Sequence, residues 1–226
     1  MYGRNCEVYS PHTQEHVWNI PHLPQELQVS SYTGSNHAIK RTQLWLRECE
    51  ETHLSCNYSK SPLPSRVLLI RGPQQVELYE SNRETVPYAC LSHCWGKKHI
   101  IRTTKATLQH HKQSISWKRL PLTFRQAISF TYRLGLKHLW IDSLCIIQDD
   151  VEDWRFEGSK MSQIYSGAYI TLAATASRDA SGGCFVTPPT ALSSASHIQT
   201  KKAQSRTCAF DQGCKISDDL MGMHLY

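Results

Sequence analysis

A strand pattern that leads directly into a helix pattern occupies residues 139–165 and indicates the class of fold. The apolar residues 139–141 end at Asp142, and an amphipathic helix is expected from about 150 to 165. At about 100° per residue, Glu157 falls on the apolar face of this helix. A carboxylate there costs free energy unless it is paired, so Glu157 is either a structural hydrogen-bond or ion-pair partner or a functional carboxylate. The other residues of that face are Trp154, Met161, Ile164 and Tyr165.

Further strand and helix patterns alternate around this run. The small apolar residues 88–92 are typical of a strand that is buried on both faces. Helical spacing after Pro121 predicts a helix that ends near Gly135, and a last strand is expected at 168–174. Strands that alternate with helices imply parallel pairing, so we expect an α/β fold with a parallel sheet flanked by helices.

Composition divides the chain into four segments. The N-terminal segment is rich in His, Pro, Ser and Gln and shows little periodicity, whereas the C-terminal segment is dominated by Ser, Thr, Ala, Gln and Pro. Between them, a helix is expected at about 41–56, and short strands are expected at 67–70 and 75–80. The predicted segments are a loosely ordered arm (1–40), a helix with short strands (41–87), the main domain (88–185) and a low-order tail (186–226).

Membrane, secretory and metal-binding classes are not indicated. No stretch approaches the roughly 20 apolar residues of a membrane span, and the N-terminus lacks an apolar signal core, so a cytoplasmic protein is expected. The nine cysteines are an odd number and are interpreted mostly as small buried hydrophobes. Cys49, His53 and Cys56 have a spacing that suits zinc, but no fourth ligand is obvious and no metal is predicted.

Charge is distributed unevenly along the chain. Residues 97–137 contain ten Lys or Arg and no acidic residue, whereas residues 142–157 contain six acidic residues and one Arg. The basic segment serves an anionic ligand or contacts between subunits, or it is a solvated surface. Its residues are dispersed, without zinc-finger spacing or an RNA-binding signature, so no nucleic-acid partner is expected.

Two motifs follow strands of the expected parallel sheet, where ligands commonly bind. In the first motif, residues 92–96, Trp95 offers a stacking plane or a core anchor, and Gly96 allows the backbone to approach a ligand closely. In the second, Asp142 binds hydroxyl groups or caps the following turn. Neither a dinucleotide fingerprint nor a P-loop is present. The candidate ligand-binding residues at this edge are Ser92, Trp95, Gly96, Lys97, Arg102 and Asp142.

Several long motifs, in order, resemble the fungal HET (heterokaryon incompatibility) domain. The first motif is the Tyr88–Gly96 run, in which the family more often has Tyr at the position of His93. The second ends in the Leu139–Asp149 run, and the third surrounds Glu157. The matching residues are 88–96, 120–124, 127–128, 134–135, 139–149, 152–154, Glu157, Met161, 164–165, Ala168 and 182–185.

The resemblance implies a role in self/non-self recognition and regulated cell death after fusion of unlike fungal cells. HET domains are also similar to TIR (Toll/interleukin receptor) domains, which implies a flavodoxin-like sheet. Some TIR domains cleave NAD+ with a glutamate on a helix, and Glu157 is the matching position. On this hypothesis Glu157 is catalytic, Trp95 stacks on a ring and the basic loop 97–105 holds the pyrophosphate. NAD+ is then a substrate, and no cofactor is required.

The alternative hypothesis is a non-catalytic interaction module. It self-associates, or binds another incompatibility protein, through its acidic and basic surfaces, and Glu157 is then a buried structural partner. The two hypotheses differ in whether Glu157 lines an open cleft together with Trp95.

Overall fold

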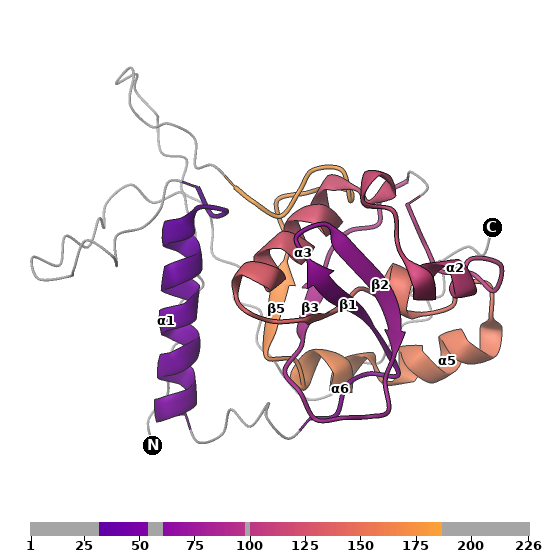
Figure 1. Cartoon of the computed structure of the whole chain (residues 1–226), viewed down its shortest axis with the longest axis horizontal. Helices are drawn as coiled ribbons and strands as arrows, with labels where there is room; N and C mark the ends of the chain where they lie inside the picture. The colour runs from indigo at the N-terminus through magenta and orange to yellow at the C-terminus, as the bar shows by residue number, and fades with distance from the viewer. Residues whose placement is uncertain (1–31, 54–60, 98–99, 187–226) are drawn as a thin grey trace, which may run out of the picture. The chain divides into compact units, whose positions relative to one another are not determined.

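The computed structural model describes residues 32–53, 61–97 and 100–186 of the chain (Figure 1). Most of the predicted arm and nearly all of the predicted tail lie outside the described residues. No helix in the described part is both long and apolar enough to cross a membrane. The elements are α1 (Asn36–Thr52), β1 (Arg66–Gly72), β2 (Gln75–Glu80), β3 (Ala89–Ser92), α2 (Leu108–Gln113), η3 (Trp117–Arg119), α3 (Leu122–Arg133), β4 (His138–Trp140), α4 (Asp142–Cys145), α5 (Val151–Ser159), α6 (Met161–Ser166) and β5 (Ile170–Ala173).

The five strands form one mixed sheet in the order β2-β1-β4-β3-β5. Strand β3 pairs in parallel with both β4 and β5, which confirms the parallel pairing expected for these three strands. The prediction of a wholly parallel sheet is wrong, because β1 runs antiparallel to β2 and to β4. The reason for the pairing of β1 with β2 is the two-residue turn at Pro73 and Gln74, since so short a connection joins only antiparallel strands.

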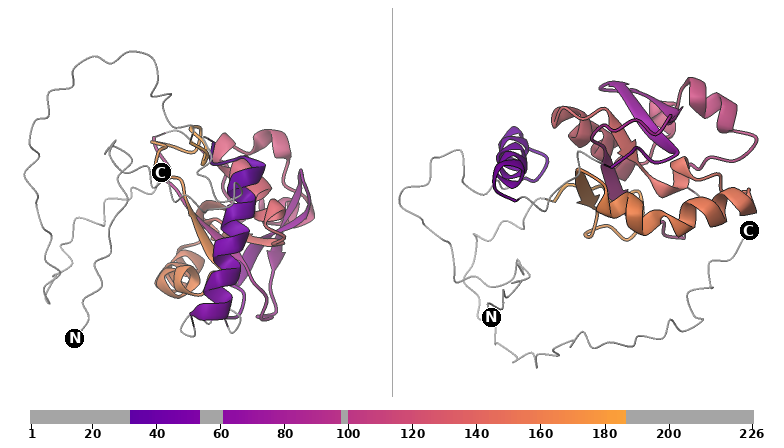
Figure 2. Two further views of the ribbon diagram at one scale, coloured as in Figure 1. Left: turned by 90° about the vertical axis from the view of Figure 1, so that its left-hand side faces the viewer. Right: turned by 90° about the horizontal axis from the view of Figure 1, so that it is seen from below.

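The centre of the sheet is covered on both faces. Ala89, Cys90 and Leu91 of β3 are fully buried, as their unbroken apolar run predicts. Helix α3 buries Phe124 and its apolar neighbours, and it ends before Gly135, which has a φ of 86°. Figure 2 shows α3 on one side of the sheet and the orange helices α5 and α6 on the other.

Helix α1 begins earlier than predicted, at Asn36 rather than about residue 41. The side chain of Ser35 accepts a hydrogen bond from the backbone N–H of Ala38 and so caps the first turn. The helix ends at Thr52, before the predicted end near residue 56, which lies outside the described residues.

The single helix predicted for residues 150–165 is two helices, α5 and α6, which meet at Lys160. Gly158 and Ser159 are weak helix formers, and they precede the break. The predicted apolar face is confirmed only in part. Trp154 is 49% exposed, contrary to the prediction, whereas Glu157 is the buried residue of α5.

Candidate functional site

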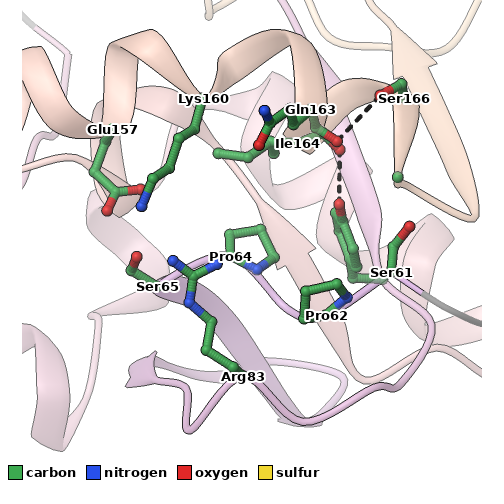
Figure 3. Close-up of a pocket in the computed structure, with 12 residues that line it drawn as sticks. Ser61, Pro62, Pro64, Ser65, Arg83, Glu157, Lys160, Gln163, Ile164 and Ser166 are labelled. Atoms are coloured by element: carbon green, nitrogen blue, oxygen red, sulfur yellow. Dashed lines mark hydrogen bonds between the residues drawn. The ribbon is translucent and has the colours of Figure 1, made fainter.

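A cavity of about 270 Å³ lies beside Glu157 (Figure 3). Its upper wall is the junction of α5 and α6, which contributes Glu157, Lys160 and Gln163. Its lower wall comes from the segment that enters β1, including Ser65, and from Arg83 in the loop after β2. The walls are therefore far apart in the sequence and meet only in the folded domain.

The Glu157 side chain is held out of water at the edge of this cavity. Glu157 is only 2% exposed. Among the described residues, no side chain or backbone N–H donates a hydrogen bond to its carboxylate or forms an ion pair with it. A buried carboxylate without such partners is costly, and a ligand that brings hydroxyl groups or positive charge into the cavity supplies them.

Two cationic side chains share the cavity with Glu157. Figure 3 shows the Lys160 side chain reaching down from the helix to the level of the Glu157 carboxylate, and Arg83 reaching up from the loop below them. The Lys160 ammonium also lies 3.2 Å from the centre of the Phe156 ring. The site thus combines one buried anion with two cations, a pattern suited to a ligand that carries both hydroxyl groups and negative charge.

A neighbouring ion pair fixes the position of α5 and hence of Glu157. Nη2 of Arg66 donates to both carboxylate oxygens of Asp153, at 2.7 and 2.5 Å. Asp153 also accepts a hydrogen bond from the backbone N–H of Ile147, and Nε of Arg66 donates to the carbonyl oxygen of Cys145. Asp153 precedes Glu157 by one helical turn, so it holds the same face of α5 against β1.

Neither member of this pair was predicted as a site residue. The available signal was Arg66 itself, a charged residue that directly precedes the apolar run 67–70 of β1. Its partner was not identifiable, because the two residues lie 87 positions apart.

The buried thiol of Cys145 lies close enough to Glu157 and Asp142 for their charges to affect its pKa. Burial raises the pKa of Cys145 to about 12, and the negative charges of Asp142 and Glu157 add to this effect. At neutral pH the thiol is therefore protonated, and it is not a nucleophile.

The predicted ligand-binding edge forms a second cluster, at the carboxyl ends of β3 and β4. Nε1 of Trp95 donates to the carboxylate of Asp142 at 2.8 Å. Asp142 also accepts from the backbone N–H of Ser143 and lies 3.9 Å from Nδ1 of His93. Burial raises the pKa of Asp142 and lowers the pKa of His93, and each group opposes the shift of the other.

Trp95 does not share a cavity with Glu157, contrary to the arrangement expected for one NAD+ site. Trp95 lines a separate pocket of about 150 Å³, together with Ile100, Arg119 and Asp179. The indole is held by Asp142, so its orientation is fixed from inside the domain. The cleft expected to contain both residues is thus two pockets.

At Gly96 the backbone leaves space that a neighbouring segment fills. Its φ is 72°, and a Cβ atom at this position would lie 2.3 Å from Cβ of Asp179. The segment that follows β5 therefore occupies the space that the glycine leaves.

The remaining edge residues are at the surface. Ser92 ends β3 and is exposed, as are Lys97 and Arg102. Their predicted roles in ligand binding stay predictions.

In the described part of the chain, no group of three or more His, Cys, Asp or Glu side chains is arranged to hold a metal ion. Nδ1 of His53 lies 3.4 Å from Sγ of Cys49, on the last turns of α1. Cys56, the third residue of that spacing, lies outside the described residues.

Comparison with known proteins identifies one family. A model of the heterokaryon incompatibility protein (HET) family matches residues 88–220, which is more than half of the chain. The match includes the Trp95 and Asp142 edge and both helices above the cavity, whereas Ser65 and Arg83 precede it. No curated protein and no solved structure matches the chain.

Proposed function

The chain belongs to the heterokaryon incompatibility (HET) family, which implies a role in heterokaryon incompatibility, and we propose that it acts as an effector that cleaves NAD+ in the Glu157 cavity. In this proposal the effector contributes to the death of fused, unlike fungal cells. The substrate is a dinucleotide whose ribosyl group enters the cavity.

One observation carries the proposal. The carboxylate of Glu157 is almost completely buried, it lines a cavity, and it has no partner among the described residues. A carboxylate in this state accepts hydrogen bonds from ribose hydroxyl groups and stabilises positive charge that develops on the sugar.

The chemistry requires little else from the protein. The bond between the ribose C1 atom and the nicotinamide nitrogen breaks, and its electron pair leaves with neutral nicotinamide. The ribosyl cation that develops lies beside Glu157, and water adds to C1 and releases a proton. The low polarity around a buried carboxylate strengthens this electrostatic stabilisation.

The proposal gives the edge residues no part in this chemistry. Trp95 lines a different pocket, and Asp142 holds its indole there. The proposed mechanism therefore leaves out the predicted stacking of Trp95 on a ring of the substrate. Tyr88 is the aromatic side chain of the Glu157 cavity, and its hydroxyl donates to the carbonyl oxygen of Ile164.

The test is nicotinamide release from NAD+ by the purified full chain. Glu157→Gln keeps the volume and removes the charge, so release should fall at least about 100-fold, the scale of a lost catalytic group. Glu152→Gln is the matched control, because Glu152 is an exposed glutamate on the same helix, and it should act as wild type. Equal release by Glu157→Gln and wild type, or no release by wild type, contradicts the proposal.

A second candidate function is a non-catalytic module that self-associates. The observation that favours it is a pair of half-exposed apolar side chains on one side of α5: Val151 at 50% and Trp154 at 49%. Large exposed apolar side chains grouped on one helix mark interaction surfaces. The helix also carries the exposed Glu152, which complements the basic residues 97–119 of another copy.

Sedimentation velocity separates this candidate from the first. Trp154→Gln should weaken self-association without changing nicotinamide release. Tyr132→Gln is the control, because Tyr132 is 43% exposed on α3, and it should have no effect. A wild-type chain that stays monomeric at all concentrations rejects the module.

A further inference from the structure

We infer that Arg83 and Lys160 form an anion subsite of the Glu157 cavity, which binds the phosphate group of a ribosyl phosphate. The inference rests on the proposed function and names the part of the substrate that this cavity takes.

The loop that carries Arg83 is held firmly against the other wall of the cavity. The backbone N–H of Ser81 donates to the carbonyl oxygen of Ser65 at 2.9 Å, and that of Leu63 donates to the carbonyl oxygen of Glu84 at 3.0 Å. Between these two bonds, Arg83 has a φ of 60°, a left-handed conformation that only the surrounding contacts sustain. These contacts set the direction in which the Arg83 side chain leaves the loop, toward the cavity (Figure 3).

Lys160 is placed by the break between the two helices. Its backbone N–H donates to the carbonyl oxygen of Glu157 and closes α5. Its ammonium lies over the Phe156 ring, a contact that favours the cation at this position.

Neither cation is neutralised by a carboxylate. Among the described residues, no Asp or Glu oxygen lies within 4.0 Å of the Arg83 guanidinium or the Lys160 ammonium. Other cations of the domain do form such pairs, as Lys105 does with Asp150 and Lys112 with Glu80. The two unpaired cations thus lie together, on either side of one cavity, next to a buried carboxylate.

This arrangement matches one class of ligand. The planar guanidinium of Arg83 suits two phosphate oxygens at once, and the Lys160 ammonium adds a point charge. Glu157 repels phosphate but accepts hydrogen bonds from hydroxyl groups, so the phosphate lies at the cations and the sugar lies at the carboxylate. The cavity is near the lower limit of small-ligand sites, roughly 300–1,000 Å³, so it takes one ribosyl phosphate rather than a whole dinucleotide.

The subsite joins the matched family region to the segment before it. Lys160 lies within residues 88–220, whereas Arg83 lies before them. The preference for a phosphorylated ligand therefore depends on a loop that the family match does not include.

The experiment is a calorimetric titration of the full chain with ADP-ribose, which carries ribosyl phosphate but no nicotinamide to release. Arg83→Gln and Lys160→Gln should each raise the Kd about tenfold, and Arg83→Lys should raise it less, because it keeps the charge. Lys137→Gln is the control, since this exposed lysine precedes β4 and does not line the cavity. Thermal unfolding of each variant verifies that the fold is kept.

The outcomes separate this subsite from the proposed catalysis. An unchanged Kd in Arg83→Gln and Lys160→Gln overturns the subsite, whether or not NAD+ is cleaved. Binding that depends on both residues, in a chain that releases no nicotinamide, overturns the catalysis and supports the subsite. A wild-type chain that does not bind ADP-ribose overturns the subsite, and nicotinamide release decides the catalysis separately.

Discussion

Arg66 and Asp153 form a two-point hydrogen-bonded ion pair that joins the start of β1 to the first half of α5. Their side chains are only 10% and 16% exposed. The pair holds the helix face that presents Glu157, so the stability of the domain and the geometry of the cavity depend on the same contact.

Asp153→Ala should therefore destabilise the domain strongly. The change leaves Arg66 buried without its carboxylate and removes the acceptor of the Ile147 N–H, which together should lower the free energy of unfolding by about 3 kcal/mol. Urea denaturation measures this change, and Glu152→Ala, at an exposed position on the same helix, should cost less than about 1 kcal/mol. The double variant Arg66→Met/Asp153→Leu should be more stable than Asp153→Ala. A double variant no more stable than Asp153→Ala would rule out the uncompensated charge as the cause.

Glu157→Gln should leave the domain at least as stable as wild type. The carboxylate has no partner among the described residues, so replacing it removes the cost of a buried charge and breaks no bond. The same variant should abolish cell killing when expressed in fungal cells. A loss of more than about 1 kcal/mol on urea denaturation would instead identify Glu157 as a structural partner.

Gly96→Ala should cost more stability than Gly135→Ala. Both glycines have positive φ, 72° and 86°, so both changes add backbone strain of about 1 kcal/mol. Only at Gly96 does the new methyl group meet another atom, Cβ of Asp179, and overpacking adds a further 1–3 kcal/mol or so. Thermal unfolding of the two variants gives the difference, and equal melting temperatures would show that residues 178–179 move away at no cost.

The His93 and Asp142 pair predicts a loss of stability in mild acid. Burial lowers the pKa of His93, so below its ordinary pKa of 6.5 the unfolded chain takes up the proton first. Stability should fall as the pH decreases from 6.5 toward the lowered pKa. Burial raises the pKa of Asp142, which opposes this fall because the folded state then binds that proton more readily.

His93→Phe isolates the effect. Neither ring nitrogen of His93 has a hydrogen-bond partner, and the ring packs edge-on against Phe124, so the change should cost little at pH 7. It removes the titrating group and raises the Asp142 pKa further, and both effects should reduce the loss between pH 7 and pH 5. Urea denaturation at the two pH values measures this loss of stability. If His93→Phe loses as much stability as wild type, the loss belongs to His111 or His138, whose pKa values burial also lowers.

The sequence predicted burial correctly where the spacing of apolar residues within a single strand or helix decides it. The apolar run of β3 and the spacing of α3 predicted burial correctly, and the position of Glu157 among apolar residues predicted that its side chain leaves water. These inferences need only the period of a strand or a helix.

The rest depends on contacts between distant segments. The wall that Arg83 contributes lies more than 70 residues from Glu157, so no local spacing indicates it. The break at Lys160 was not predicted, because the apolar spacing of residues 150–165 was interpreted as one continuous helix. Trp154 is exposed although that spacing assigned it to the apolar face. The antiparallel pairing of β1 with β2 follows from the short turn between them, and its pairing with β4 is a contact between distant segments.

The placement of β3 between β4 and β5 has a consequence for biosynthesis. Ala89 pairs with Leu139 and with Ile170, so its two partners leave the ribosome about 50 and 80 residues later. Until the second partner emerges, one side of an apolar strand keeps its backbone groups unpaired and open to association with other chains. The nascent chain therefore passes through an interval in which this apolar strand is open to association, and that interval ends when residues 170–173 pair with β3.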